Sequence, residues 1–199
     1  MKGKFITIDG IDGSGKTTQA EMLSKYLKGN GIKSIVTKEP TSGKIGSLLR
    51  NHYLKTDFPL IDSFLFSADR EEHLKTEVIP TMEKGTYIIS DRYYHSALAY
   101  QYTSGVDLDW LIHLNKFFLK PDVTIFIDTK PETSMDRMKN RAELLEKFEH
   151  LEFLTKLRAN YLEVMDRLKS GENIVIIDGN KTIEEVHNDI IKIVEPLIS

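Results

Sequence analysis

The sequence contains no cysteine and no apolar run long enough to cross a bilayer. Without cysteine, the chain has no disulfide framework, no thiolate metal ligand and no thiol nucleophile. The apolar runs at residues 123–127 and 174–177 are far shorter than the ~20 residues of a membrane helix. The first apolar run starts within a few residues of Met1, which leaves no room for a signal peptide. These absences predict a cytoplasmic protein without a membrane partner.

A long basic run is also absent, and the charges nearly balance. The 27 lysines and arginines against 30 aspartates and glutamates give a formal net charge of -3 at pH 7. Nucleic-acid-binding surfaces are usually strongly basic, so nucleic acid is not expected as a partner. The chain does have enough apolar residues, 40% of 199, for one sizeable core. This content predicts a single domain over residues 1–199.

One stretch near the start of the chain carries a specific chemical motif. Gly10-Ile-Asp-Gly-Ser-Gly-Lys-Thr17 fits G-x-x-x-x-G-K-[ST], the P-loop, with an apolar run before it and a helical pattern after it. In such a loop, backbone N–H groups surround phosphate, the lysine reaches the β- and γ-phosphates and the hydroxyl ligates Mg²⁺. The residues expected to hold ATP are Gly10, Ile11, Asp12, Gly13, Ser14, Gly15, Lys16, Thr17 and Thr18.

Short apolar runs alternate with longer helical patterns along the rest of the chain. This alternation is typical of a parallel sheet with helices on both faces. We predict an α/β fold of the P-loop NTPase class, a three-layer sandwich around a five-stranded parallel sheet. The predicted strands are residues 4–8, 34–37, 87–90, 123–127 and 174–177. Beyond the helix that follows the P-loop, the predicted helices are residues 44–54, 59–84, 94–102, 107–118, 131–140, 146–169 and 183–198.

Acidic residues follow two of the predicted strands, where open parallel sheets bind their ligands. Asp91 ends an apolar run and is the candidate Walker B carboxylate for Mg²⁺. Arg92 beside it could bind a phosphate through two N–H groups, although a surface pair that closes a turn is the alternative. Asp128 has the same local form, but the helix that begins at Pro131 favours a turn or capping role for it.

Two predicted helices carry side chains suited to a nucleobase. Phe66, Arg70 and His73 share one face of the helix at residues 59–84. An aromatic plane and an arginine, with Gln101 of the next helix, can stack on a base and read its edge. From spacing alone, a core Phe66 and a solvated Arg70 are the favoured alternative. We interpret His73 as a structural hydrogen-bonding residue.

The loop after the second predicted strand offers a weaker phosphate ligand. This loop contains Glu39, and it leads to Arg50 on a predicted helix. Polar loop residues after a strand face the ligand site of such a sheet. A lone helical arginine is usually solvated, so Arg50 alone is weak evidence.

Cations also follow the fourth predicted strand. Arg137 and Arg141 are four residues apart, and a charged stretch follows them. Residues 137–150 would form a short lid that brings positive charge over the triphosphate, a type of contact that contributes about 10³–10⁵-fold in rate. A solvated helix face with a Glu143–Lys147 pair explains the spacing equally well.

Together these motifs resemble the thymidylate kinase family along nearly the whole chain. The P-loop alone indicates only an NTPase, whereas the segments at 65–73 and 91–101 are far more specific when taken together. The resemblance rests on those three segments and on Lys38-Glu-Pro, Gly46, Arg50, Pro121-Asp-Val-Thr, Asp128, Phe153, Arg158 and Tyr161-Leu.

The resemblance implies Mg²⁺-dependent transfer of the ATP γ-phosphoryl group to dTMP, by a homodimer. Phe66 would stack on thymine, and Arg70 would bond its O4 edge. Tyr100 would lie against C2′ of the sugar. The implied acceptor site consists of Asp12, Glu39, Arg50, Phe66, Arg70, Arg92, Ala97, Tyr100 and Gln101. The implied catalytic residues are Lys16, Arg92, Arg141 and Asp12, the implied metal ligands are Thr17 and Asp91, and Arg137 would lie near adenine.

Three positions depart from the pattern of that family. Asp9 stands where glutamate is usual, and Ala97 stands where many members have a polar base contact. The lid position that is often arginine is Lys147, and the P-loop itself contains no arginine. Arg141 is therefore the first candidate for the catalytic cation, ahead of Arg137 and Lys147.

Two alternatives remain at this level. The first is another nucleotide or nucleoside kinase, which would prefer a different acceptor. The second is a regulatory NTP-binding switch, although the chain lacks the N-K-x-D motif that reads guanine. The candidate arginines of a second anion site also argue against a switch.

Overall fold

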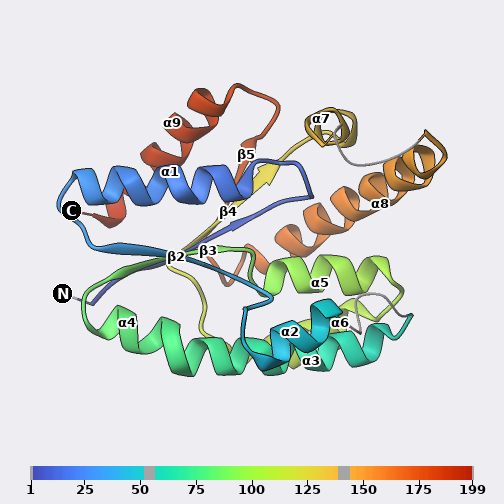
Figure 1. The fold of residues 1–199 in the computed structure, drawn as a ribbon, viewed down its shortest axis with the longest axis horizontal. Coiled ribbons are helices and arrows are strands. Elements are labelled where there is room, and N and C mark those ends of the chain that lie inside the picture. The colour runs from blue at the N-terminus through green and yellow to red at the C-terminus, as the bar shows by residue number, and fades with distance from the viewer. Residues whose placement is uncertain (1, 52–56, 139–143, 199) are drawn as a thin grey trace.

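A five-stranded parallel sheet lies at the centre of the molecule, with helices on both faces (Figure 1). The computed structural model describes residues 2–51, 57–138 and 144–198. The strand order is β2-β3-β1-β4-β5, so the first strand of the chain is the middle strand of the sheet. The strands are β1 (Phe5–Asp9), β2 (Ser34–Lys38), β3 (Tyr87–Asp91), β4 (Val123–Asp128) and β5 (Ile174–Asp178).

The central strand β1 is buried along its whole length. Alternate residues of a strand point to opposite faces, so Phe5 packs in one apolar core and Ile6 and Ile8 pack in the other. A strand that is covered on both faces has a nearly continuous apolar sequence. This is why the run was recognisable as a buried strand.

One face of the sheet is covered by α1 (Lys16–Gly29) and α9 (Ile183–Val194), which lie together in Figure 1. Leu23 of α1 and Ile190 of α9 share an apolar core with Ile8 of the sheet. The start of α9 is fixed by a capping box between Thr182 and Glu185. This core holds α1, and with it the end of the P-loop, against β1.

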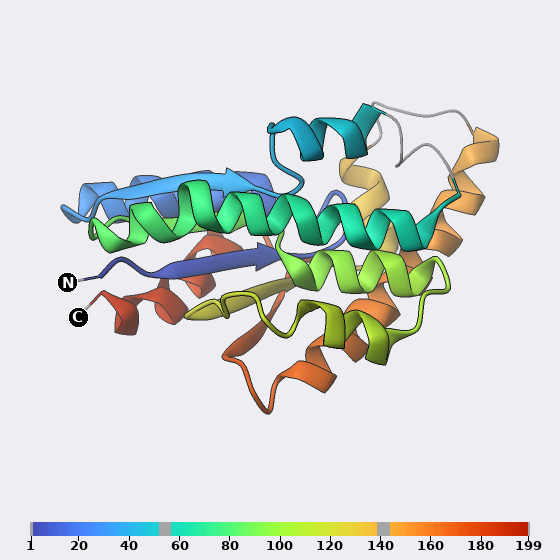
Figure 2. The same ribbon diagram turned by 90° about the horizontal axis from the view of Figure 1, so that it is seen from below.

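The opposite face carries a larger set of helices (Figures 1 and 2). Their apolar residues form a second core, in which Tyr161 stacks on Phe126 of β4 with ring centroids 5.1 Å apart. The helices of this face are α3 (Pro59–His73), α4 (Ile79–Glu83), α5 (Tyr94–Thr103), α6 (Leu108–Asn115) and α8 (Leu144–Leu168). The short helices α2 (Lys44–Asn51) and α7 (Pro131–Arg137) lie toward the carboxyl ends of the strands (Figure 2).

The helical segment predicted at residues 59–84 is not one uniform α-helix. After α3, a π-helical turn at Leu74–Val78 leads into α4. Pro80 supplies no backbone N–H, and its ring crowds the preceding turn. A wider turn before the proline accommodates both effects.

The predicted fold class is confirmed, and the predicted strands are correct to within one residue. Every strand ends one residue later than predicted, on a charged residue: Asp9, Lys38, Asp91, Asp128 or Asp178. The helices predicted at 107–118 and 183–198 are shorter than expected and end at Asn115 and Val194. In the parts of the chain that the structure describes, no helix is long and apolar enough to span a membrane.

Candidate active site

The P-loop joins the carboxyl end of β1 to the first turn of α1. Gly13 and Gly15 have φ angles of 77° and 94°, a left-handed backbone that other residues rarely adopt. A Cβ atom on Gly13 would lie 2.6 Å from the carbonyl oxygen of Ser134, so α7 packs directly on the loop. The first turn of α1 has no side-chain cap and no acidic residue, which leaves its N–H groups and the positive end of its dipole for an anion.

Lys16 is the first residue of α1, and its side chain turns back over the loop. Only 6% of the residue is exposed, and Nζ donates a hydrogen bond to the carbonyl oxygen of Ile11 at 2.8 Å. Burial, together with the charge of Arg92, lowers the pKa of Lys16 to about 7. A phosphate bound in the loop would favour the charged form again. The buried ammonium is therefore placed to respond to an anionic ligand.

Thr17 and Asp91 meet beside the loop. The Thr17 hydroxyl donates to Oδ2 of Asp91 at 2.5 Å. The other carboxylate oxygen of Asp91, Oδ1, is buried and has no hydrogen-bond partner among the described residues. A hydroxyl and a carboxylate with a spare oxygen are ligand types that Mg²⁺ prefers. This pair therefore fits the metal site expected from the sequence.

A pocket of about 470 Å³ lies over the P-loop. The side chains around it are mostly cationic or polar, with two apolar residues from the start of α9. A cationic pocket at a helix N-terminus is suited to a nucleoside triphosphate. It is lined by Asp12, Gly13, Ser14, Gly15, Lys16, Thr17, Thr18, Gln19, Asp91, Arg92, Arg137, Lys181, Ile183 and Val186.

A second pocket, of about 370 Å³, lies on the other side of Asp12. Residues from α3 and α5 form most of its wall. It is more aromatic than the first pocket, and aromatic side chains are suited to a nucleobase. It is lined by Asp12, Glu39, Pro40, Asp62, Phe66, Arg70, Arg92, Tyr93, Ser96, Ala97, Tyr100, Gln101 and Ser104.

Asp12 and Arg92 line both pockets and touch each other. Arg92 NH2 lies 2.5 Å from Oδ1 of Asp12, and the Tyr100 hydroxyl donates to Oδ2 at 2.9 Å. Burial opposes the charge on Asp12, but Arg92, Lys16 and the Tyr100 hydrogen bond outweigh burial and lower the pKa of this carboxyl group. Asp12 is therefore charged at neutral pH and can accept hydrogen bonds from a ligand in either pocket.

Arg92 is held in an uncommon backbone conformation. Its φ is 75°, and it is the only described residue other than glycine with a positive φ. The turn directs the guanidinium back toward the sheet edge, where NH1 donates to Ser96 at 3.2 Å and to Tyr161 at 3.3 Å. Left-handed conformations cost on the order of 1–2 kcal/mol in non-glycine residues, and they cluster at ligand sites.

Arg70 is buried in the wall of the second pocket, which contradicts the solvated alternative considered from spacing. It is 1% exposed, and its Nε donates to Oε2 of Glu39 at 2.9 Å while NH1 donates to Asn115 at 2.6 Å. Glu39 also faces Nδ1 of His73 at 3.1 Å, so His73 helps to hold this pair. Arg70 NH2 also lies 2.9 Å from Oε2 of Glu39 in this ion pair, and it makes no hydrogen bond to another described residue, so its second N–H group can serve a ligand.

Four further acceptor-site candidates, Phe66, Ala97, Tyr100 and Gln101, line the same pocket. Phe66 is half-buried, and Ala97 and Gln101 are buried on the facing helix α5. Burial, modified by Arg92 and Asp12, raises the pKa of Tyr100 to about 12, so this hydroxyl remains a hydrogen-bond donor at neutral pH. The pocket thus combines an aromatic ring, an amide and two guanidinium groups.

Not every candidate residue reaches a pocket. Arg50 donates from NH1 to the carbonyl oxygen of Pro40 at 2.8 Å and lies outside the acceptor pocket. Gly10 and Ile11 support the P-loop without lining the donor pocket. Arg137 does line it, and its NH2 donates to the carbonyl oxygen of Lys181 at 3.3 Å. Arg141 and the rest of residues 139–143 of the predicted lid lie outside the described residues, and so does the Lys147 side chain.

The turn or capping role expected for Asp128 is wrong. Both carboxylate oxygens accept from Arg158 of α8, at 2.6 Å from Nε and 2.8 Å from NH2. Arg158 is distant in sequence, so local spacing could not reveal this pair. Asp128 therefore ties β4 to α8.

The sequence interpretation missed residues of both pockets. Asp62 is one helical turn before Phe66, and that spacing could have placed it in the acceptor pocket. Lys181 and Ile183 follow β5 in the donor pocket, where the rule of carboxyl strand ends applies as well. Ser96 of the acceptor pocket received no role from the sequence, because its role depends on its contact with Arg92.

The chain matches known proteins over nearly its whole length. The family model for thymidylate kinase matches residues 8–190 of the chain. A probable thymidylate kinase from Pyrococcus abyssi (strain GE5 / Orsay) is 39% identical over 98% of this chain and 97% of its own length. A thymidylate kinase from Carboxydothermus hydrogenoformans is 40% identical over 94% of each chain. The chain therefore belongs to the thymidylate kinase family.

Proposed function

We propose that the protein transfers the γ-phosphoryl group of ATP to dTMP, with Mg²⁺, to form ADP and dTDP. Membership of the thymidylate kinase family makes it a phosphotransferase that acts on a nucleoside monophosphate. The observation that carries the proposal is the position of Asp12 and Arg92 between two adjoining pockets. A residue pair at such a junction contacts the donor and the acceptor at the point where the phosphoryl group moves.

The transfer needs little acid–base chemistry from the protein. The attacking atom is a phosphate oxygen of dTMP, which is already anionic, so no strong general base is required. Catalysis then consists of holding the two phosphates in line and neutralising their charge. Lys16 and Arg92 supply positive charge on the donor and acceptor sides, and Asp12 orients Arg92.

The residues around Asp91 fit a Mg²⁺ ion that arrives with ATP. Oδ1 of Asp91 is a buried acceptor without a hydrogen-bond partner in the described structure, and Thr17 stands beside it. Among the described residues there is no cluster of three or more acidic, histidine or cysteine side chains that could hold a metal. Phosphate oxygens and water would therefore supply the other ligands. When bound, the ion would neutralise charge on the β- and γ-phosphates.

A panel of acceptors tests the proposed reaction. We expect dTMP to give the highest kcat/KM among dTMP, dUMP, UMP, dCMP and thymidine. Thymidine should be the poorest acceptor, because it offers no phosphate to Arg92. UMP should be poor because Tyr100 lines the part of the pocket assigned to the sugar. The measurement is ADP release for each acceptor at fixed Mg²⁺–ATP.

The same panel separates the alternative functions. ATP turnover that does not depend on any acceptor would support a regulatory switch and contradict the proposal. A higher kcat/KM for dUMP, UMP or dCMP would assign the protein to another acceptor, while leaving the phosphotransferase class intact. A cytoplasmic location stays a prediction from the sequence.

We also propose that the protein is a homodimer through the outer face of α3. Leu60 and Phe64 of this helix are each 55% exposed, and Ile61 is 40% exposed. The Phe64 ring packs edge-on against Trp110 of α6 at 5.5 Å, so the apolar area extends over both helices. Contiguous apolar surface of this kind usually marks an interface. A second copy of the chain is the occupant that the family resemblance implies.

Replacing Phe64 with glutamate should weaken the dimer. The charge would have to be buried without a partner, so we expect dissociation into monomers at micromolar concentration. Analytical ultracentrifugation of wild type and variant measures this. The matched control is Phe117→Glu, because Phe117 is 83% exposed and lies outside the α3 face. A wild-type protein that is monomeric at all concentrations would contradict the homodimer.

A further inference from the structure

A fully buried histidine that lines neither pocket lies between two carboxylates. His95 of α5 is 0% exposed, and its Nε2 lies 2.9 Å from Oε2 of Glu172, in the loop before β5. On its other side, Nδ1 faces Oδ2 of Asp9 at 3.6 Å. This approach is an ion-pair distance and not a hydrogen bond, and neither atom has a hydrogen-bond partner among the described residues. Asp9 is also fully buried, so His95 is its counter-charge on that side.

The other carboxylate oxygen of Asp9, Oδ1, is connected to Arg92 through hydrogen bonds of the Ser96 hydroxyl. The Ser96 hydroxyl donates to Oδ1 of Asp9 and accepts from Tyr161 at 2.7 Å and from Arg92 NH1 at 3.2 Å. A hydroxyl has one proton and two lone pairs, so Ser96 uses its full capacity. Its lone pairs are free for Arg92 and Tyr161 only while its proton goes to Asp9.

We propose that His95 is a positioning residue for Arg92. Its imidazolium keeps Asp9 a hydrogen-bond acceptor for the Ser96 hydroxyl, so that Ser96 can accept a hydrogen bond from Arg92. This inference rests on the proposed function, since it assigns Arg92 to the phosphate of dTMP. The chain of contacts runs from Glu172 through His95, Asp9 and Ser96 to Arg92. It starts outside both pockets and ends where they meet.

The surroundings of His95 favour its charged form. Burial alone would lower the pKa of the imidazole, but the carboxylates of Asp9 and Glu172 outweigh burial and raise it. The ring stacks on Tyr94 with centroids 4.1 Å apart, and burial and Glu172 raise the pKa of that phenol, so Tyr94 brings no charge. Lys120 is the further charge near Glu172. His95 is therefore an imidazolium that lies between the carboxylates of Asp9 and Glu172.

Loss of the imidazolium should affect Arg92 by reversing the direction of the hydrogen bond between Ser96 and Asp9. Without it, Asp9 would be a buried carboxylate with no counter-charge on Oδ2, and its protonated form would be favoured. A protonated Asp9 can donate to Ser96, and Ser96 then loses a lone pair for Arg92 or Tyr161. Arg92 would be less firmly oriented, which weakens binding of an acceptor phosphate more than it affects the P-loop.

The test is a double-mutant cycle between His95 and Ser96, read through steady-state kinetics. For His95→Gln we expect the KM for dTMP to rise about tenfold, as for loss of one hydrogen bond to a charged group. The KM for ATP and kcat should each change by less than about threefold. Ser96→Ala should raise the KM for dTMP similarly. In the Ser96→Ala background, His95→Gln should add little, because the relay is already broken.

Controls separate positioning from stability. His113→Gln makes the same chemical change at an exposed histidine of α6 and should leave both KM values unchanged. Glu172→Gln removes the outer carboxylate and should raise the KM for dTMP less than His95→Gln does, which keeps the test available should the His95 variant fail to fold. Effects of His95 and Ser96 that multiply, or equal changes in both KM values, would overturn the inference. Absence of dTMP turnover in wild type would instead overturn the proposed function.

Discussion

The Lys16→Ala variant is expected to keep the fold and to lose phosphoryl transfer, with kcat lowered by at least about 10²–10³-fold. Lys16 is the cation of the donor pocket that the P-loop itself provides, and its Nζ is already held over the loop by the carbonyl oxygen of Ile11. Charge on the transferring group is greatest in the transition state. Loss of this cation therefore lowers kcat as well as ATP affinity.

The Lys16→Ala protein should also be at least as stable as wild type. Burial lowers the pKa of Lys16 to about 7, from 10.5 for an exposed lysine. A lysine whose pKa is lowered by folding destabilises the folded protein at every pH below its unfolded value, because protonation favours the unfolded chain. Removing it should therefore leave the melting temperature of the nucleotide-free protein unchanged or higher. Thermal unfolding without nucleotide measures this.

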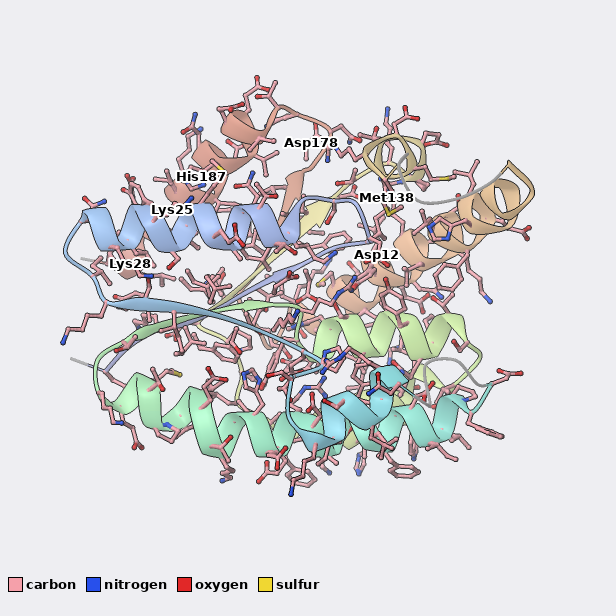
Figure 3. The ribbon with its side chains drawn as sticks, in the orientation of Figure 1. Asp12, Lys25, Lys28, Met138, Asp178 and His187 are labelled. Carbon is pink, nitrogen blue, oxygen red and sulfur yellow. The ribbon has the colours of Figure 1, made fainter. Side chains whose placement is uncertain are left out.

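The matched control is Lys25→Ala on the same helix, where the lysine is exposed and away from the loop (Figure 3). It should change neither kcat nor the melting temperature appreciably. An active Lys16→Ala protein would remove the P-loop from the proposed mechanism. An inactive but unfolded one would leave the catalytic role undecided, so both measurements are made on each variant.

The fold was predictable because its signals are local. The strands are short apolar runs that helices cover on both faces, and Gly13 and Gly15 adopt the left-handed backbone that the motif requires. The P-loop therefore identifies both a structure and a ligand from one stretch of sequence. Charged residues at strand ends, such as Asp91, follow from the same reasoning.

The acceptor site was less predictable, because its residues depend on partners far along the chain. Arg70 resembles a solvated helical arginine until Glu39 and Asn115 are placed beside it. Asp128 meets Arg158 from another element, which no local pattern shows. In both cases an ion pair with a distant residue decides the orientation of the side chain, fully buried for Arg70 and half-buried for Arg158, and helix periodicity gives only its face.

Arg92, at the junction of the pockets, depends both on a local sequence signal and on partners far along the chain. Arg92 follows a strand, as the sequence indicates, but its conformation depends on contacts with Asp12, Ser96, Tyr100 and Tyr161. A positive φ at a non-glycine residue has no clear sequence signal. Its presence shows that surrounding contacts outweigh the local backbone preference.

Replacing Arg92 with alanine should therefore have an effect as large as the loss of Lys16, but on the acceptor side. We expect kcat/KM for dTMP to fall by about 10³-fold, because Arg92 is assigned to the acceptor phosphate and to charge in the transition state. The KM for ATP should change far less. Initial rates with dTMP and ATP varied in turn give both values. A fall that is confined to the ATP parameters would move Arg92 to the donor site.

Two further substitutions separate backbone strain from the chemistry of the guanidinium. Arg92→Gly should be more stable than Arg92→Ala by about 1 kcal/mol, because glycine adopts a φ of 75° without steric cost. Both should be equally inactive. Arg92→Lys keeps the charge but loses the planar fork that donates to Asp12, Ser96 and Tyr161 at once. It should recover only part of the lost kcat/KM.

The control for charge is Arg167→Ala, which removes an exposed arginine of α8 that is paired with Asp109. Exposed pairs contribute little, so activity and stability should stay close to wild type. If Arg92→Lys restored full activity, positive charge alone would suffice, and the fixed direction of the guanidinium would have no role. If lysine fails where arginine works, Arg92 acts by holding the acceptor phosphate at a fixed position relative to the P-loop. The left-handed turn after β3 then exists to supply that position.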